Sequence, residues 1–133
     1  MDKMAEEAAR RKTWNLGIGL VACLVFACIV FSMIISSPKR VSYIVIGDAA
    51  RAHVRYMTPS GTVDQYVSLP WQSQAMAFSR NDKGKRAFIY ADNMKEPGKR
   101  VDVKVIVDGR VVCFETGAED EGYIDAMCNE PLW

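Results

Sequence analysis

A single uncharged run near the N-terminus constrains this chain more than any other feature. Residues 16–35 read LGIGLVACLVFACIVFSMII and contain one hydroxyl group, that of Ser32. A helix of about 20 residues spans about 30 Å, the hydrocarbon thickness of a bilayer. Only a helix satisfies the backbone of an isolated segment in lipid, and Trp14 precedes the run where indole rings favour the headgroup region. The sequence therefore predicts a transmembrane helix over residues 14–36.

The cations on either side of this run predict its orientation. Before it lie Lys3, Arg10, Arg11 and Lys12, whereas only Lys39 and Arg40 follow closely. Positive charge near a span favours the cytoplasmic side. We therefore expect a single-pass protein of the inner or plasma membrane, with a cytoplasmic segment at 1–13, the span at 14–36, a hinge at 37–40 and an extracytoplasmic domain at 41–133.

Other interpretations of the apolar run remain open. A buried core helix is rarely apolar on every side, and the apolar region of a cleaved signal covers about 7–15 residues. Leu20–Cys23 has the pattern of a lipobox, in which Cys23 would be lipidated, although mostly apolar residues follow it. Gly19, Cys23 and Ala27 share one helix face and are candidates for close helix packing, but small residues are also common in spans that have no partner.

Strand patterns dominate residues 41–133. Short β-rich runs are separated by Gly, Pro, Asn and Asp, and no segment there has a clear helical period. The expected strands are 41–46, 52–57, 62–67, 74–78, 87–91, 101–107, 111–114 and 123–128. The predicted fold class is therefore an all-β, small antiparallel sandwich of immunoglobulin-like size, preceded by one N-terminal transmembrane α-helix.

Two turns carry specific expectations. Asp108-Gly109 follows an alternating valine strand and predicts a type I′ hairpin turn. Without a bulge, this turn pairs Lys104 with Cys113 and Val103 with Phe114. Leu69, Pro70 and Trp71 form a structural corner, because proline lacks the N–H that a ladder needs. We expect the Trp71 ring to be buried against the sheet, whereas an exposed ring would indicate a hydrophobic docking spot.

The two cysteines outside the apolar run are candidates for a disulfide. A domain of this size buries little surface and often needs a covalent staple. Cys113 and Cys128 lie in the part expected to face an oxidising compartment. A bridge between them closes a loop of about 15 residues, which stabilises by roughly 3 kcal/mol in the chain-entropy model. The alternative is a pair of reduced, buried thiols in a domain that faces the cytoplasm.

The order of short motifs resembles the MmpS family (mycobacterial membrane protein, small). After a charged N-terminus and one span come Val41-Ser-Tyr43-x-Val45-x-Gly47, Val54-x-Tyr56, Ser60-Gly61, Val67-x-Leu69-Pro70-Trp71, Val105-Ile-Val107-Asp108-Gly109 and Cys128. The resemblance covers most of residues 14–128. It implies an anchored extracytoplasmic β-sandwich that assists a large transporter of the resistance-nodulation-division type, which exports lipids or siderophores. The chain departs from the family in placing a cysteine at 113 where the family tends to have one at the position of Val103.

Charge and motif content argue against enzymes and nucleic-acid binders. The 17 Lys and Arg nearly balance the 16 Asp and Glu, whereas nucleic-acid-binding domains are usually basic. The four cysteines include no C-x-x-C pair, so the sequence offers no metal centre and implies no cofactor. His53, the only histidine, lies beside Arg55 on the polar face of its strand, and sequence proximity supplies no catalytic partner.

Two charged clusters are candidates for contact with other molecules. Arg80, Lys83, Lys85 and Arg86 form a basic loop that would suit anionic headgroups or an acidic partner. Glu115, Glu119, Asp120, Glu121 and Asp125 form an acidic stretch that would suit docking or weak calcium binding, although it lacks an ordered calcium-loop spacing. For both clusters the alternative is an ordinary solvated surface.

These features together predict a non-enzymatic, membrane-anchored accessory subunit whose sandwich docks on a large envelope transporter or export complex. One alternative is a structural subunit of a multi-copy envelope assembly such as a secretion apparatus, in which copies of the chain contact one another. The other is an extracytoplasmic domain that binds a lipid or another ligand. The expected partners are the membrane, a polytopic transporter or another envelope protein, or a second copy, and not nucleic acid.

Overall fold

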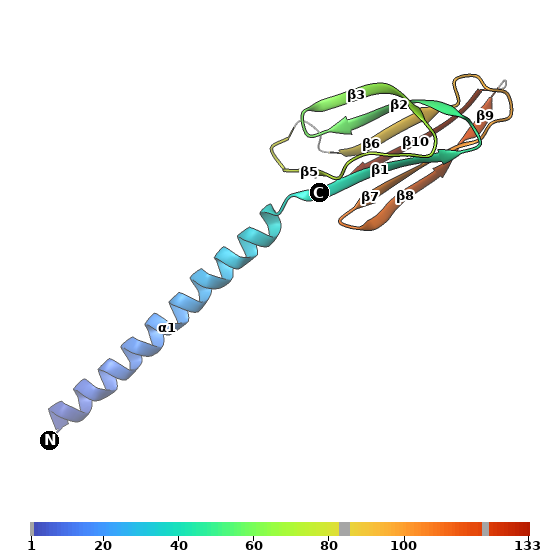
Figure 1. The fold of residues 1–133 in the computed structure, drawn as a ribbon. Coiled ribbons are helices and arrows are strands. Elements are labelled where there is room, and N and C mark those ends of the chain that lie inside the picture. Colours follow the sequence, from blue (N-terminus) through green and yellow to red (C-terminus); the bar gives the residue numbers. More distant parts are fainter. Residues whose placement is uncertain (1, 83–85, 121–122) are drawn as a thin grey trace. The chain divides into compact units, whose positions relative to one another are not determined.

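The chain forms two separate units, a helix and a β-domain. The computed structural model describes residues 2–82, 86–120 and 123–133, and the units comprise Met1–Ser37 and Pro38–Trp133. The first unit contains one helix, α1 (Asp2–Ser36), which continues unbroken from the charged N-terminal residues into the apolar run (Figure 1). Helix α1 is long and apolar enough to cross a membrane.

Local bonds and the following proline account for the extent of α1. The Ser32 hydroxyl donates to the Cys28 carbonyl at 2.8 Å, so this polar group is satisfied inside the helix. Pro38 disfavours the helical conformation in the residue before it, and α1 ends at Ser36. The first strand starts at Lys39, within the expected hinge, so only Ser37 and Pro38 lie between helix and strand.

The second unit is a sandwich of two antiparallel sheets, as predicted. Its strands are β1 (Lys39–Gly47), β2 (Arg51–Thr58), β3 (Gly61–Ser68), β4 (Trp71–Gln72), β5 (Met76–Phe78), β6 (Arg86–Asp92), β7 (Val101–Val107), β8 (Arg110–Thr116), β9 (Ala118–Asp120) and β10 (Tyr123–Pro131). Sheet A has the order β4-β1-β7-β8, with β5 also paired to β1, and sheet B has the order β3-β2-β6-β10-β9. The expected strand at 74–78 is shorter, and β4 and β9 were not expected.

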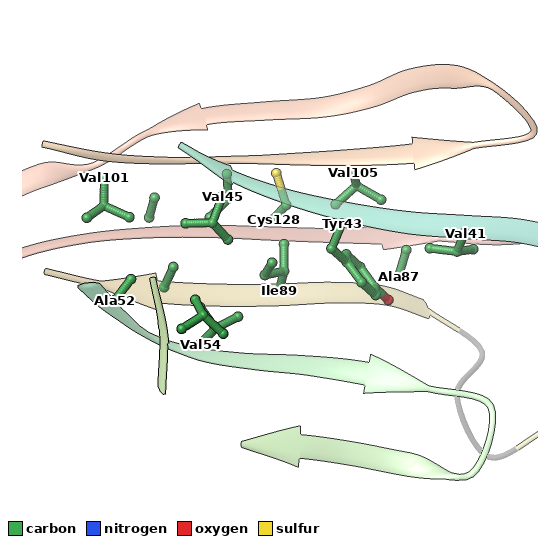
Figure 2. Close-up of a cluster of buried hydrophobic side chains, with 14 of the residues drawn as sticks. Val41, Tyr43, Val45, Ala52, Val54, Ala87, Ile89, Val101, Val105 and Cys128 are labelled. Carbon is green, nitrogen blue, oxygen red and sulfur yellow. The ribbon is translucent and has the colours of Figure 1, made fainter. Parts of the chain in front are cut away.

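The core lies between the two sheets and consists mainly of alternating small and β-branched residues (Figure 2). In sheet A, Val41, Tyr43 and Val45 of β1 are fully buried, as are Val101, Val103 and Val105 of β7. Sheet B contributes alanines together with Val54 and Ile89. The small alanines leave room for the Tyr43 ring, whose hydroxyl donates to the Met57 carbonyl at 2.8 Å. Burial raises the pKa of Tyr43, so this hydroxyl stays protonated and keeps the bond.

The β7–β8 hairpin has the predicted turn but not the predicted register. Asp108 and Gly109 both have positive φ, at 49° and 79°, as a type I′ turn requires. A bulge then shifts the ladder. The observed pairs are Val105 with Cys113, Lys104 with Phe114 and Val103 with Glu115, which corrects the register expected without a bulge. The extra residue reverses the alternation of side chains beyond it.

This shift brings Cys113 to the side of the hairpin that faces the other sheet. Cys113 there forms the predicted disulfide with Cys128 of β10, with a Cα–Cα distance of 6.1 Å. The bridge joins sheet A to sheet B, because β8 belongs to the first and β10 to the second. Strands of two different sheets are thus covalently linked across the core.

The corner at Leu69, Pro70 and Trp71 joins the two sheets. The Leu69–Pro70 peptide bond is cis, and Trp71 enters β4 opposite Val45 of β1. The Trp71 ring is half-buried and its centroid lies 5.3 Å from that of Tyr56 in sheet B. Trp71 therefore closes the gap between the sheets at this end, partly exposed rather than fully buried.

Candidate functional site

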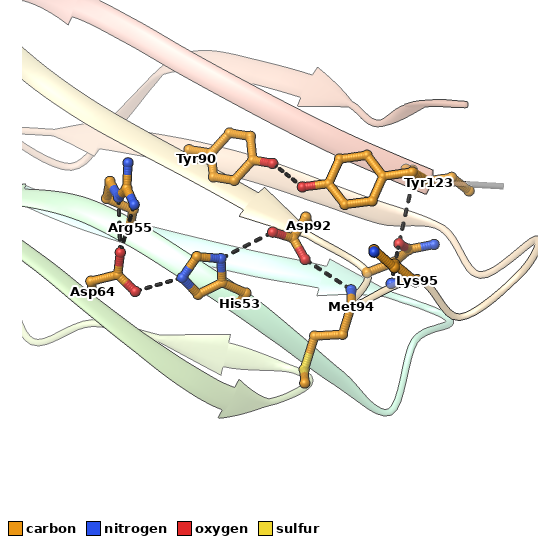
Figure 3. Close-up of polar contacts among 10 residues, drawn as sticks. His53, Arg55, Asp64, Tyr90, Asp92, Met94, Lys95 and Tyr123 are labelled. Atoms are coloured by element: carbon orange, nitrogen blue, oxygen red, sulfur yellow. Dashed lines mark hydrogen bonds and ion pairs between the residues drawn. The ribbon is translucent and has the colours of Figure 1, made fainter. Parts of the chain in front are cut away.

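The outward face of sheet B gathers polar and aromatic side chains around the only histidine. His53 lies on β2, which pairs with β3 on one side and β6 on the other. Cross-strand pairing puts His53 opposite Tyr66 of β3 and Asp92 of β6. Figure 3 shows the imidazole ring between two carboxylates. Residues far apart in the sequence thus form one cluster on one face of sheet B.

Both ring nitrogens of His53 contact carboxylate oxygens. Nδ1 lies 3.0 Å from Asp92 Oδ2, and Nε2 lies 2.5 Å from Asp64 Oδ1. The second oxygen of Asp64 accepts from Arg55 Nε at 2.9 Å. The cluster therefore ties β2 to β3 through Asp64 and to β6 through Asp92.

The carboxylates and the imidazole shift each other's protonation. The hydrogen bond that His53 donates to Asp64 raises the pKa of His53, against an opposing effect of burial, and the bond that it donates to Asp92 raises this pKa further. In return, the bonds from His53 and then Arg55 lower the pKa of Asp64. The arrangement favours a positively charged imidazole and a negatively charged Asp64.

The chain after β6 supports the cluster from one side. Asp92 Oδ1 accepts from the Met94 amide at 2.9 Å, and Asn93 Oδ1 accepts from the Lys95 amide at 3.1 Å. Met94 and Lys95 both have positive φ, which non-glycine residues rarely adopt. Asn93 is fully buried, and its side-chain amide also donates to the Glu96 carbonyl at 2.7 Å. These bonds hold the loop in a strained but fixed conformation.

Aromatic and methionine side chains surround this cluster on the same side of the sheet. Tyr90 and Tyr123 bond through their hydroxyl groups (Figure 3), and burial raises the pKa of each. A hollow of about 310 Å³ is lined by His53, Tyr66, Asp92, Met94, Lys95 and Tyr123. We call the set Tyr66, Tyr90, Tyr123, Met94 and Met127 the tyrosine face.

Carboxylates occupy both ring nitrogens of His53 in this geometry. A general base needs a free imidazole nitrogen within reach of substrate, but each nitrogen of His53 faces a carboxylate. Among residues 2–82, 86–120 and 123–133, no group of three His, Cys, Asp or Glu side chains is arranged to hold a metal ion. What the contacts of His53 do show is a link between the three strands β2, β3 and β6.

The other candidate residues from the sequence lie apart from this cluster. Gly19, Cys23 and Ala27 are exposed along α1, and Cys23 is a free thiol. Arg80 is exposed, whereas the first residue of β6, Arg86, donates from Nε to Asn129 Oδ1 at 2.6 Å. Lys83 and Lys85 of the basic loop, and Glu121 of the acidic stretch, lie outside the described residues.

Sequence reasoning placed His53 and Arg55 correctly on a polar face but missed both carboxylate partners. The predicted β2–β3 hairpin already contained a usable signal, because its tight turn brings Asp64 opposite Arg55 and next to His53. Asp92 had no such signal, since β6 is not adjacent to β2 in the chain. Comparison of the sequence with models of known families and with curated proteins finds no match to either.

Proposed function

We propose that this chain is a non-enzymatic, membrane-anchored accessory subunit that docks on a large envelope membrane protein through the tyrosine face. The observation that carries the proposal is the composition of that face. Tyr66 is 61% exposed and Met127 is 56% exposed, on the same face as Arg55. Tyrosine, methionine and arginine are enriched in protein interfaces relative to other surfaces. Their concentration over one rigid sheet face supports docking.

Rigidity supports the same proposal. A preformed surface loses less conformational entropy on binding than a mobile one. The hydrogen bonds of His53, Asp92 and Asn93 fix the strands and the loop beneath the exposed rings. Tyrosine adds contact area at a low entropic cost because it has few rotatable bonds.

The helix and the motif order indicate the class of partner. An anchor of the length and apolarity of α1 suits a protein that works at a membrane. The resemblance to the MmpS family then points to a polytopic transporter of the resistance-nodulation-division type. With an N-terminus in the cytoplasm, the sandwich meets such a partner on the extracytoplasmic side.

Site-specific photocrosslinking in the native host tests this function. A photoreactive amino acid replaces Tyr66 or Met127 in the full chain, and Gln74, which is exposed and outside the tyrosine face, is the matched control position. We expect both test positions, and not Gln74, to form an adduct with one many-span membrane protein, which also co-purifies in mild detergent at a fixed ratio.

Three other outcomes contradict the proposal. Adducts solely between copies of the chain would favour a structural subunit of a multi-copy assembly. Adducts solely with lipid would favour a ligand-binding domain. Equal labelling from Gln74 would show that the tyrosine face is not the docking surface.

A further inference from the structure

The contacts of His53 require two ring protons. An ionised carboxylate only accepts hydrogen bonds, and a neutral imidazole has one N–H. His53 faces Asp92 with Nδ1 and Asp64 with Nε2. Both contacts are favourable only when the ring is an imidazolium. Loss of one proton must therefore replace one hydrogen bond with repulsion between lone pairs.

The environments of the two carboxylates decide which bond is lost. The Asp92 side chain is 9% exposed, whereas the Asp64 side chain is 45% exposed. A buried acceptor loses more when its donor disappears. Asp64 also keeps the Arg55 guanidinium as a second donor at 2.9 Å. The remaining proton therefore stays on Nδ1 towards Asp92, and the contact with Asp64 opens.

The strand that carries Asp64 lies at an edge of its sheet, with a neighbouring strand on one side alone. Strand β3 is an edge of sheet B and pairs solely with β2 in the described residues. Tyr66 on β3 packs against the His53 ring, with centroids 5.0 Å apart. A positive ring attracts the face of an aromatic neighbour more than a neutral one does. Deprotonation thus weakens both the Asp64 contact and the Tyr66 contact of β3.

We propose that protonated His53 fixes the edge strand β3 and Tyr66 on sheet B, and we call this set of contacts the lock. Docking through the tyrosine face then depends on the pH outside the membrane. This inference rests on the proposed function for its docking consequence, but the lock itself is a property of the sandwich alone. Acidic conditions close the lock, and a rise in pH opens it.

The charged and titratable groups around His53 agree with this direction. They are Arg51 and Arg55 on β2, Asp64 and Tyr66 on β3, Tyr90 and Asp92 on β6, Lys95 after β6, and Tyr123 and Asp125 on β10. Deprotonation of His53 removes the positive charge that lies between Asp64 and Asp92. Repulsion among the carboxylates therefore increases in the open state.

The single histidine makes the test direct. The full chain, without a histidine tag, is labelled with ¹³C-histidine in detergent micelles and titrated by NMR from about pH 5 to about pH 9. We expect one imidazole signal whose midpoint lies above the ordinary value of 6.5. Across the same midpoint, hydrogen-exchange protection of β3 amides, measured relative to β7 amides, should fall roughly tenfold.

Matched variants separate the lock from general effects of charge. Asp64→Asn should lower the His53 midpoint, and His53→Gln should remove the pH dependence of β3 protection. Asp108→Asn is the control, because Asp108 is also an exposed carboxylate with a cationic neighbour but lies in the turn between β7 and β8 of sheet A, and it should leave the midpoint unchanged. A midpoint at or below 6.5, or β3 protection that is constant across the midpoint, overturns the lock.

Crosslinking from Met127 at pH values below and above the midpoint tests the docking consequence. We expect the yield of the partner adduct to fall severalfold above the midpoint. A constant yield would overturn pH-dependent docking and leave the proposed function standing. Absence of any adduct at either pH, together with a normal His53 titration, would overturn the proposed function and leave the lock standing.

Discussion

Strands β8 and β3 occupy edges of the two sheets, and they are attached to the sandwich by different chemistry. Cys113 joins β8 covalently to β10, whereas Asp64 joins β3 to the His53 ring by a charged hydrogen bond. The first link responds to reductant and not to mild pH change. In our proposal the second responds to pH and not to reductant. Equivalent positions in the two sheets therefore differ in what can loosen them.

Loss of the disulfide should have the largest effect. We expect the double variant Cys113→Ala with Cys128→Ala to lose about 3 kcal/mol of unfolding free energy, because the unfolded chain regains the entropy of a loop of about 15 residues. Urea unfolding followed by far-ultraviolet circular dichroism measures the change. Cys23→Ala with Cys28→Ala, which alters thiols of α1 alone, is the control and should leave the sandwich transition in place. An unchanged midpoint in the first variant would show that β8 does not depend on the bridge.

Replacement of the histidine should have a smaller effect that is confined to sheet B. We expect His53→Gln to cost about 1 kcal/mol near pH 6, because glutamine keeps a donor but not the positive charge that serves two carboxylates. Hydrogen exchange should locate the loss in β2 and β3 and not in β8. Arg51→Gln, a change at an exposed position of the same strand, is the control for loss of positive charge. Equal losses in both variants would contradict a specific role for the ring.

The stability that the His53–Asp64 contact contributes should fall both at high pH and at low pH. The pKa of His53 is raised above 6.5, so its contribution is fully present below pH 6.5 and is lost as pH rises through the folded-state pKa. The pKa of Asp64 is lowered below 3.8, so its contribution is present above pH 3.8 and is lost as pH falls through the folded-state pKa. The difference in unfolding free energy between wild type and His53→Gln should therefore be largest between pH 3.8 and 6.5. Urea titrations across the range would contradict this if the difference grew above pH 8.

A change at the tip of the β7–β8 hairpin should have the smallest effect. Asp108 accepts from the Arg40 amide at 3.0 Å and lies 3.4 Å from Lys39 Nζ. The Arg40 bond first, and Lys39 second, lower the pKa of Asp108, so its contribution is lost as pH falls through that pKa. Because the group is largely solvated, we expect Asp108→Asn to cost a few tenths of a kcal/mol at neutral pH by thermal unfolding. A loss comparable with that of the disulfide variant would mean that the turn contact, and not the bridge, positions β8.

Much of the fold followed from local sequence signals. The uncharged run defined α1, the alternating valines defined the buried face of β7, and Asp108-Gly109 gave the correct turn. The register of β8 did not follow, because nothing in a run of valines marks which residue is the extra one in a bulge. The disulfide could nevertheless be predicted. That prediction rested on the two cysteines of the domain and on the small size of its core, and not on the register of β8.

Much less of the candidate site than of the fold could be predicted from the sequence. His53 and Asp92 meet because β2 and β6 are adjacent in sheet B, although three strands separate them along the chain. Sheet order is set by how all the strands bury their apolar faces together, and no local pattern encodes it. The contact with Asp64 could have been predicted from the register of the β2–β3 hairpin. One of the two carboxylate partners of His53 was therefore predictable from the sequence.

The bridge between the sheets also links folding to oxidation. A stabilisation of about 3 kcal/mol corresponds to roughly a hundredfold difference in the unfolded population. Chains held where thiols remain reduced would therefore expose their hydrophobic interior far more often and be degraded faster by proteases that recognise opened chains. Oxidation of Cys113 and Cys128 would then act as a maturation checkpoint, because the protein would persist longer where the bond has formed.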